Sequence, residues 1–115
     1  IIGEDFISDK SVCLILGDNI FYGHGLIEKV KTAMKINSGA AIFCQQVKDP
    51  ERYGVAEVKE NNIVVNVVEK PTKPISNWAV TGLYIFDNSV IDKAKNLTPS
   101  ARGELEITDI INQYI

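Results

Sequence analysis

Carboxylate and amide side chains follow directly after an apolar run near the start of the chain. Residues 12–16 are apolar, and Gly17 is followed by Asp18 and Asn19. A carboxylate at this position needs a partner, because burial of an unpaired charge is costly. Two interpretations stay open. Asp18 either caps the following turn or binds a hard cation such as Mg²⁺, which prefers carboxylate oxygen and keeps several waters while it bridges phosphates.

A pair of charged residues, Glu69 and Lys70, precedes Pro71. One interpretation is a solvated ion pair that contributes little to stability. The other is a sugar-phosphate site, in which the carboxylate accepts hydrogen bonds from sugar hydroxyls and the ammonium faces the phosphate. Neighbouring side chains on a regular strand point to opposite faces, so the second interpretation requires the chain to leave strand geometry at Lys70. Pro71 favours such a break.

Two further segments each allow two interpretations. Tyr53 and Gly54 either end a turn or form a place where a ligand approaches the backbone closely. Residues 100–110 are either a solvated loop with a helix cap at Thr108 or the source of a glutamate, Glu104, held against a sugar hydroxyl. The charged residues of this segment are Arg102, Glu104, Glu106 and Asp109.

Asp18 and Asn19 lie in a segment whose pattern predicts a strand, a loop, a helix and a second strand. Residues 12–16 predict a strand buried on both faces, residues 25–36 have apolar positions at helical spacing, and residues 40–47 predict a second strand. This pattern indicates a βαβ unit whose first loop lies at the carboxyl end of its strand. Ligands bind at that end in open α/β sheets, and Asp18 is on that loop.

The rest of the chain predicts an antiparallel ribbon, a long strand and two helices. Residues 54–59 and 63–70 form the ribbon, with Asn61 and Asn62 in its turn. Residues 78–86 predict the longest strand, and helices begin from Asn88 and near Thr108. We therefore expect a single α/β domain over residues 1–115, with a mixed, mainly parallel, Rossmann-like sheet, flanking helices and the ribbon.

Composition and charge limit the classes of function. The 12 basic and 15 acidic residues give a net charge of −3, and the scattered basic residues argue against a nucleic-acid partner. No apolar run reaches the roughly 18 residues of a membrane span, and no basic leader pattern is present, so we expect no membrane partner and a cytoplasmic location. Cys13 and Cys44 lie in apolar runs without CxxC spacing, which predicts buried free thiols.

Five segments together are similar to a known family. LGDNIFYGHG, KDPERYGVAEV, VVEKPTKP, NWAVTGLYIFD and SARGELEITDI resemble, in this order and spacing, the bacterial glucose-1-phosphate thymidylyltransferases from end to end of the chain. The resemblance implies a partial nucleotidyltransferase domain, glucose 1-phosphate and a deoxythymidine nucleotide as ligands, and Mg²⁺ as cofactor. It also implies a place in sugar nucleotide biosynthesis through dTDP-glucose, as in the dTDP-rhamnose pathway. A homo-oligomer is expected for a separate reason, because loss of the family's N-terminal strands and helices would uncover apolar faces that a monomer rarely exposes.

The resemblance assigns roles to individual residues. Asp18 would bind the metal and act in catalysis with Lys70, which would hold the sugar phosphate. Tyr22, Gly23 and His24 would lie near a regulatory nucleotide site, although a lone loop histidine is otherwise simply an exposed side chain. The residues implied to contact substrate are Asn19, Tyr53, Gly54, Glu69, Lys70, Val80, Tyr84 and Glu104.

The sequence also departs from the family pattern. Family members begin with a glycine-rich loop carrying an arginine, followed by a lysine, and bring a second metal-binding aspartate from farther toward the C-terminus. Neither feature occurs in these 115 residues, so we expect a fragment that lacks thymidylyltransferase activity alone and self-associates. The alternatives are a truncated, non-catalytic α/β domain that self-associates, or a fragment of a uridylyl- or adenylyl-type sugar nucleotidyltransferase.

Overall fold

The longest strand, β5 (Trp78–Phe86), lies at the centre of the sheet. In the computed structural model, which describes residues 2–115, β5 pairs with β1 (Val12–Ile15) and β3 (Gly54–Lys59) along one edge and with β2 (Ala40–Gln46) along the other. β4 (Ile63–Glu69) pairs with β3 and completes a five-stranded sheet. The predicted central strand and the predicted antiparallel ribbon of β3 and β4 are thereby confirmed.

The direction of the strands differs from the prediction. The α/β class with flanking helices is confirmed, but every strand pairing within residues 2–115 is antiparallel, so the prediction of a mainly parallel sheet was wrong. The reason is the position of β5. β1 and β2 run in the same direction, as a βαβ unit requires, but β5 lies between them and pairs with both. Local hydrophobic patterns do not show which later strand is inserted.

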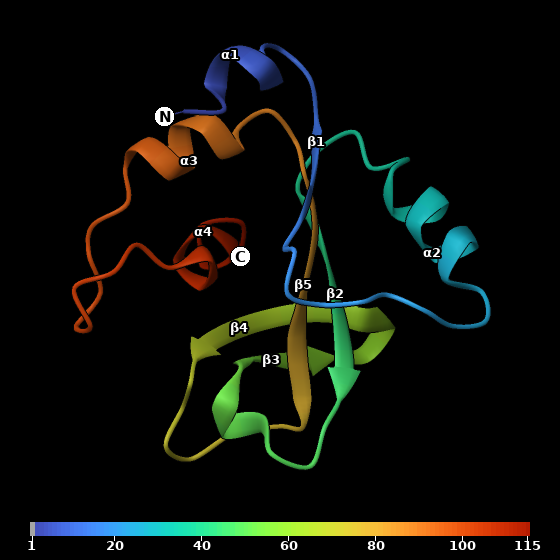
Figure 1. Cartoon of the computed structure of the whole chain (residues 1–115), viewed down its shortest axis with the longest axis vertical. Helices are drawn as coiled ribbons and strands as arrows, with labels where there is room; N and C mark the ends of the chain where they lie inside the picture. The colour runs from blue at the N-terminus through green and yellow to red at the C-terminus, as the bar shows by residue number, and fades with distance from the viewer. Residues whose placement is uncertain (1) are drawn as a thin grey trace.

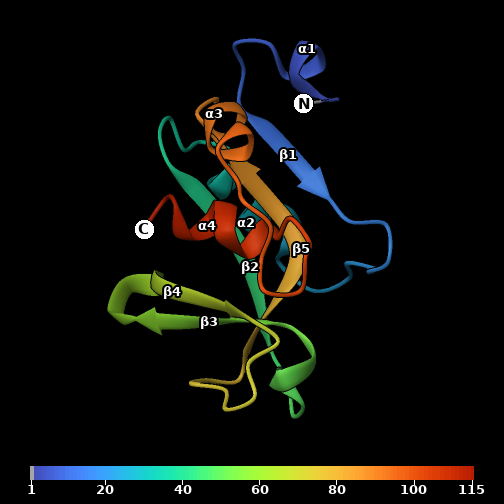
Figure 2. The ribbon, with the colours of Figure 1, turned by 90° about the vertical axis from the view of Figure 1, so that its left-hand side faces the viewer.

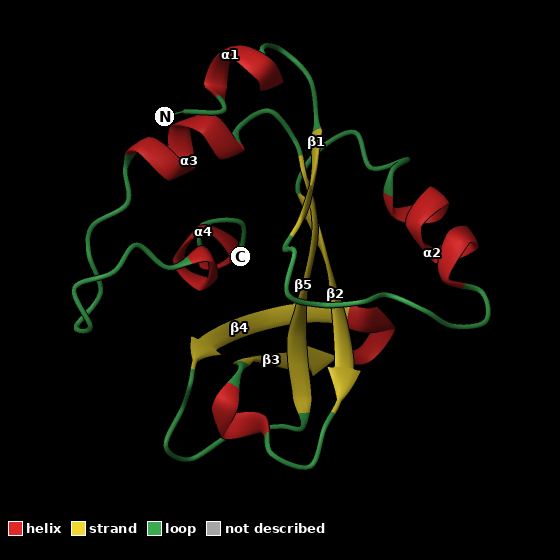
Figure 3. Cartoon of the chain, in the orientation of Figure 1, coloured by secondary structure: helices red, strands yellow, loops and turns green. Residues whose placement is uncertain are grey.

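Helices lie on both sides of the part of the sheet formed by β1, β5 and β2 (Figures 1 and 3). α2 (Leu26–Ala33) lies on one side, whereas α3 (Val90–Lys95) and α4 (Ile107–Asn112) lie on the other. The short α1 (Glu4–Ile7) precedes β1, and two 3₁₀ turns cover Pro50–Arg52 and Glu60–Asn62. Across residues 2–115, none of these helices combines the length and the apolar composition needed to cross a lipid bilayer.

The buried core lies between β5, the ribbon and helices α3 and α4. The Phe86 ring stacks between Tyr84 and Tyr114, with ring centroids 5.7 and 5.6 Å apart. Asn112 fixes α4 to β4, because its side-chain amide exchanges two hydrogen bonds with the Val67 backbone. The buried residues of the main cluster are Ala56, Val67, Tyr84, Phe86, Val90 and Ile111.

β1 is much more exposed than the sequence predicts. Leu14 and Ile15 are 39% and 59% exposed, because β1 pairs with β5 alone and lies at the edge of the sheet (Figure 2). The prediction that residues 12–16 are buried on both faces was therefore wrong. Both cysteines are free, as predicted, but Cys13 is exposed and only Cys44 is half-buried. Burial raises the pKa of the Cys44 thiol to about 11.

Two local predictions had opposite outcomes. Asn61 and Asn62 have φ values of +61° and +60°, which confirms that the ribbon turn uses asparagine in the left-handed region. Thr108 does not cap α4. The N-cap position belongs to Glu106, without a capping side-chain hydrogen bond, and Thr108 lies inside the helix and is buried. Its side chain is needed for packing against the start of β3, as described below.

Candidate functional site

A hydrogen-bonded loop follows β1 and carries Asp18. The Leu16 N–H donates to the Gly82 carbonyl at 2.9 Å, and Asn19 Nδ2 donates to the Thr81 carbonyl at 2.9 Å. Asp18 lies between these two anchors and is exposed. Its Oδ1 accepts a hydrogen bond from Asn19 Nδ2 at 3.4 Å. The described hydrogen bonds of residues 2–115 show no backbone N–H donating to this carboxylate, so Asp18 retains oxygen lone pairs for a ligand.

The chain leaves strand geometry at Lys70. β4 ends at Glu69, and Lys70 has a φ of +42°, which is uncommon for a residue other than glycine. The Lys70 N–H still donates to the Tyr53 carbonyl at 3.0 Å. This break is the one that a shared role of Glu69 and Lys70 requires, because it ends the alternation of side chains between the two faces.

The backbone at Gly54 is surrounded by the protein itself. A side chain at this position would begin 3.0 Å from Thr108 Cγ2, 3.3 Å from Glu69 Oε2 and 3.8 Å from Val80 Cβ. Glycine is therefore needed so that the Glu69 carboxylate and the first turn of α4 can lie against β3. Val80 is half-buried and belongs to this group, whereas Tyr53 lies at its exposed rim.

Arg102 provides the cation that faces Glu69. Its Nη1 lies 3.8 Å from Glu69 Oε1 and 3.5 Å from Glu106 Oε1, and its Nη2 lies 2.9 Å from Glu104 Oε2. Burial and the Glu106 charge raise the pKa of Glu69, while Lys70 and Arg102 act in the opposite direction. The site thus holds a carboxylate whose ionised form is disfavoured, next to a guanidinium that can pair with a different anion.

Tyr84 is the residue whose hydroxyl is influenced by both carboxylates, Asp18 and Glu69. Burial, followed by the negative charges of Glu69 and Asp18, raises the pKa of its phenol to about 12. Both carboxylates therefore lie close enough to influence the same hydroxyl, although Asp18 follows β1 and Glu69 ends β4. Tyr84 is buried in the core, where its ring stacks on Phe86. The arrangement combines a partly buried carboxylate at Glu69 with an exposed carboxylate at Asp18.

Other predicted residues lie apart from this centre. Glu104 is exposed and is connected to Glu69 through Arg102, which forms ion pairs with both carboxylates. Tyr22, Gly23 and His24 line a separate hollow of about 400 Å³, together with Asn19, beside the start of α2 and the strand β2. Lys29 and Thr81 also line this hollow.

Sequence reasoning assigned no site role to Arg102 or Thr108. Arg102 had a detectable signal, because it is the only cation among the acidic residues of segment 100–110. Thr108 had none, because its threonine looked like a helix cap and its contact with Gly54 depends on the tertiary fold.

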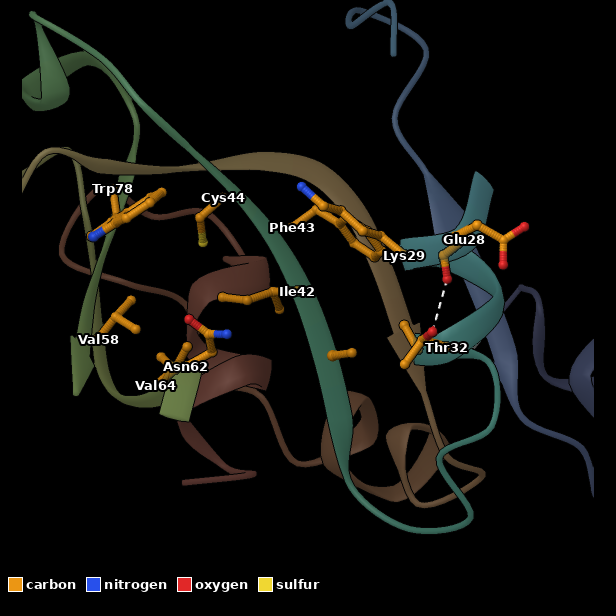
Figure 4. Close-up of a pocket in the computed structure, with 12 residues that line it drawn as sticks. Glu28, Lys29, Thr32, Ile42, Phe43, Cys44, Val58, Asn62, Val64 and Trp78 are labelled. Carbon is orange, nitrogen blue, oxygen red and sulfur yellow. Dashed lines mark hydrogen bonds between the residues drawn. The ribbon is translucent and has the colours of Figure 1, made fainter. Parts of the chain in front are cut away.

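A larger cavity lies elsewhere. It measures about 630 Å³, and Figure 4 shows that its lining residues lie on both sides of β2, from α2 to the ribbon. None of the predicted site residues lines it. A smaller cavity of about 310 Å³ lies among α1, β1, α3 and α4. Within residues 2–115, no three His, Cys, Asp or Glu side chains form a cluster that could hold a metal ion.

Comparison with known proteins gives a consistent result. The family model described as "Nucleotidyl transferase" matches residues 1–115. Curated relatives named glucose-1-phosphate thymidylyltransferase include proteins from Neisseria meningitidis serogroup A / serotype 4A, 54% identical, and Xanthomonas campestris pv. campestris, 52% identical. Both alignments cover 100% of this chain but only 40% and 39% of the relatives.

Solved structures agree with this result. The crystal structure of a proposed glucose-1-phosphate thymidylyltransferase from Bacillus anthracis, in complex with a sucrose, matches with a TM-score of 0.79 and 44% identity. This match covers 98% of the chain and 45% of that structure. A UDP-glucose pyrophosphorylase matches with a TM-score of 0.83 and 24% identity over 96% of the chain and 45% of that structure, which shows a shared fold alone. From the family model and these relatives, the chain belongs to the nucleotidyl transferase family.

Proposed function

We propose that this chain forms the sugar-phosphate-binding part of a glucose-1-phosphate thymidylyltransferase. The observation that carries the proposal is the cluster at the end of β4, where the absence of a side chain at Gly54 leaves room for the Glu69 carboxylate beside Val80. Lys70 leaves the strand next to Glu69, and Arg102 faces the same carboxylate. The relatives of this name support the choice of substrate, although the chain spans only about 40% of their length.

In this proposal the residues bind and orient glucose 1-phosphate. Glu69 accepts hydrogen bonds from sugar hydroxyls, and Lys70 and Arg102 neutralise the phosphate. A phosphate oxygen of glucose 1-phosphate attacks the α-phosphorus of dTTP, a new P–O bond forms, and the bond to the β-phosphate breaks to release pyrophosphate. The attacking phosphate is already ionised, so the reaction needs alignment and charge neutralisation rather than a general base.

Mg²⁺ is the proposed cofactor, and Asp18 is the residue that would hold it. Mg²⁺ commonly binds one or two carboxylates together with waters and substrate phosphates. The exposed Asp18 carboxylate can supply one such ligand, and no full protein cage is found within residues 2–115. When bound, the metal would neutralise phosphate charge.

The proposal has three further parts. We expect these 115 residues to bind glucose 1-phosphate without catalysing transfer, because the sequence lacks the glycine-rich loop expected to orient the triphosphate. The hollow lined by Tyr22, Gly23 and His24 is the proposed site for a second nucleotide. A homo-oligomer is the proposed state of assembly.

The proposal is tested by titrating the chain with glucose 1-phosphate and, separately, with dTTP, each with and without Mg²⁺. NMR shift mapping is expected to show glucose 1-phosphate affecting the amides near Glu69, Lys70 and Tyr84. Glu69→Gln should weaken binding about tenfold, because a charge-assisted hydrogen bond contributes roughly 1.5 kcal/mol.

Glu60→Gln is the matched control, because Glu60 is an exposed carboxylate in the ribbon turn. It should leave the affinity unchanged. Equal affinities of Glu69→Gln, Glu60→Gln and the unmodified chain for glucose 1-phosphate would contradict the proposed site. Chemical-shift changes confined to residues away from Tyr84 would contradict it as well.

A further inference from the structure

The strand β5 contains a kink between two candidate site residues. Ile42 pairs with Tyr84 and Cys44 pairs with Val80, so Phe43 alone lies opposite residues 81–83. Gly82 has a φ of +83°, a conformation that glycine adopts without a steric cost. Such a bulge disrupts the ladder locally and leaves backbone groups that need other partners.

The segment after β1 supplies these partners. The Gly82 carbonyl accepts from the Leu16 N–H, and the Thr81 carbonyl accepts from Asn19 Nδ2, each at 2.9 Å. The Thr81 hydroxyl donates to the Phe43 carbonyl at 2.7 Å and secures the kink to β2. Residues 16–19 are thus attached to β5 at two adjacent positions.

The fit between the kink and this segment is close. A side chain at Gly82 would begin 3.2 Å from Leu16 Cβ and Cδ1 and 3.3 Å from Asn19 Nδ2. Hence the approach of Asn19 to the Thr81 carbonyl depends on glycine at position 82. Asp18 lies between the two attachment points and has no backbone donor of its own within the described hydrogen bonds.

We propose that Asn19 is a positioning residue, which fixes the place of the Asp18 carboxylate by attaching its loop to the kink of β5 at Thr81 and Gly82. The functional meaning of this role rests on the proposed binding of a divalent cation by Asp18. Because the Asn19 amide nitrogen is engaged with the protein, only its carbonyl oxygen is available to a substrate. The same nitrogen donates to Asp18 Oδ1 at 3.4 Å, so one side chain contacts both the Thr81 carbonyl and the Asp18 carboxylate.

The test compares Asn19→Ala with Asn88→Ala in the 115-residue chain. Asn88 is also exposed, and its Nδ2 donates to the Ser8 carbonyl at 2.6 Å, near the other end of β1. Amide hydrogen exchange of Leu16, whose N–H donates to the Gly82 carbonyl, should become about three- to tenfold faster in Asn19→Ala, as loss of one hydrogen bond predicts. It should not change in Asn88→Ala.

Mn²⁺ titration gives the second measurement, with Mn²⁺ alone as the probe. Asn19→Ala should weaken binding near Asp18 by about the same three- to tenfold factor, and Asn88→Ala should not. Asn19→Gln keeps the amide on a longer side chain and should restore part of the protection of Leu16. If the unmodified chain binds no Mn²⁺, the metal role in the proposed function fails, while the exchange measurement still decides whether Asn19 fixes the loop.

Several results would overturn the inference. Unchanged exchange of Leu16 in Asn19→Ala would show that the hydrogen bond to Thr81 does not hold the loop. An equal effect of Asn88→Ala would show a general loosening of β1. Loss of protection throughout the chain in both Asn19 variants would mean that Asn19 is needed for folding rather than for the position of Asp18.

Discussion

At the scale of single residues, Glu69 combines a role in binding with a cost in stability. Burial and Glu106 raise the pKa of its carboxyl group. A raised pKa in the folded state means that the ionised form destabilises the fold, and this cost appears as the pH rises above the unfolded value of about 4.3. We expect Glu69→Gln to increase the free energy of unfolding at pH 7 by at most about 0.5 kcal/mol, since solvent screens the partly exposed group.

Chemical denaturation at pH 7 and at pH 3.5 would measure this effect. The difference between the variant and the unmodified chain should be absent at pH 3.5, where the carboxyl group is protonated in both states. A variant that is less stable at pH 7 would show that the Arg102 ion pair outweighs the cost of burial.

Asp87 shows the opposite behaviour. Burial alone would raise the pKa of Asp87, but hydrogen bonds from Ser89, Gly39 and Tyr114 outweigh it and lower the pKa. These bonds connect the residue before β2, the N-cap of α3 and the segment after α4. We expect Asp87→Asn to reduce the free energy of unfolding at pH 7 by about 1 to 2 kcal/mol.

The pH dependence gives the sign of this effect. A lowered pKa contributes stability above the unfolded value of about 3.9, and this contribution is lost as the pH falls through the folded value. The difference between Asp87→Asn and the unmodified chain should therefore shrink below about pH 4. Asp92→Asn, at an exposed position of α3, is the control and should change stability little. A constant difference from pH 7 to pH 3 would contradict the interpretation.

At the scale of elements, the kink in β5 depends on glycine for two reasons. Gly82 has a positive φ, and its missing side chain makes room for Leu16 and Asn19. Gly103 also has a positive φ, +74°, but no atom lies within 4 Å of the place a side chain would take. Gly103→Ala should therefore cost only the strain, about 1 kcal/mol, and Gly82→Ala should cost about 2 to 4 kcal/mol. Thermal unfolding would compare them, and equal losses would show that the close approach to Leu16 has no energetic effect.

The energetic cost of crowding between β3 and α4 can be measured without a contribution from backbone strain. Gly54 has no positive φ, and the obstacle to a side chain there is Thr108 Cγ2 at 3.0 Å. We expect Gly54→Ala to destabilise the chain by about 1 to 3 kcal/mol through overpacking. Adding Thr108→Ser, which removes the methyl group, should restore part of the loss in a double-mutant cycle. Additive effects of the two substitutions would show that the residues do not interact.

Most elements followed from the sequence because their signals are local. The ribbon turn at Asn61 and Asn62 and the apolar face of α2 depend on nearest neighbours in the chain, and both were confirmed. The site was predictable only in part. The break at Lys70 could be inferred from Pro71, whereas the contact of Thr108 with Gly54 joins segments that are far apart in the sequence.

At the scale of the whole molecule, the arrangement of the sheet was the main feature that sequence reasoning missed. An aliphatic run such as that of β1 predicts a strand, but it does not show how many of its sides are covered. β5 takes the place between β1 and β2, so β1 pairs on one edge only. Cys13 and Ile15 are exposed as a consequence.

This exposed edge is expected to make the chain self-associate. β1 contains no charged residue or proline, the devices that commonly protect edge strands, and Ile15 is 59% exposed. Light scattering should give a mass above the 12.7 kDa of one chain, increasing with concentration. Ile15→Lys should lower this mass by placing a charge on the edge. Ile63→Lys, at a 58% exposed isoleucine that begins β4, is the matched control. A monomeric mass at high concentration, or an equal decrease with Ile63→Lys, would show that association does not depend on the edge of β1.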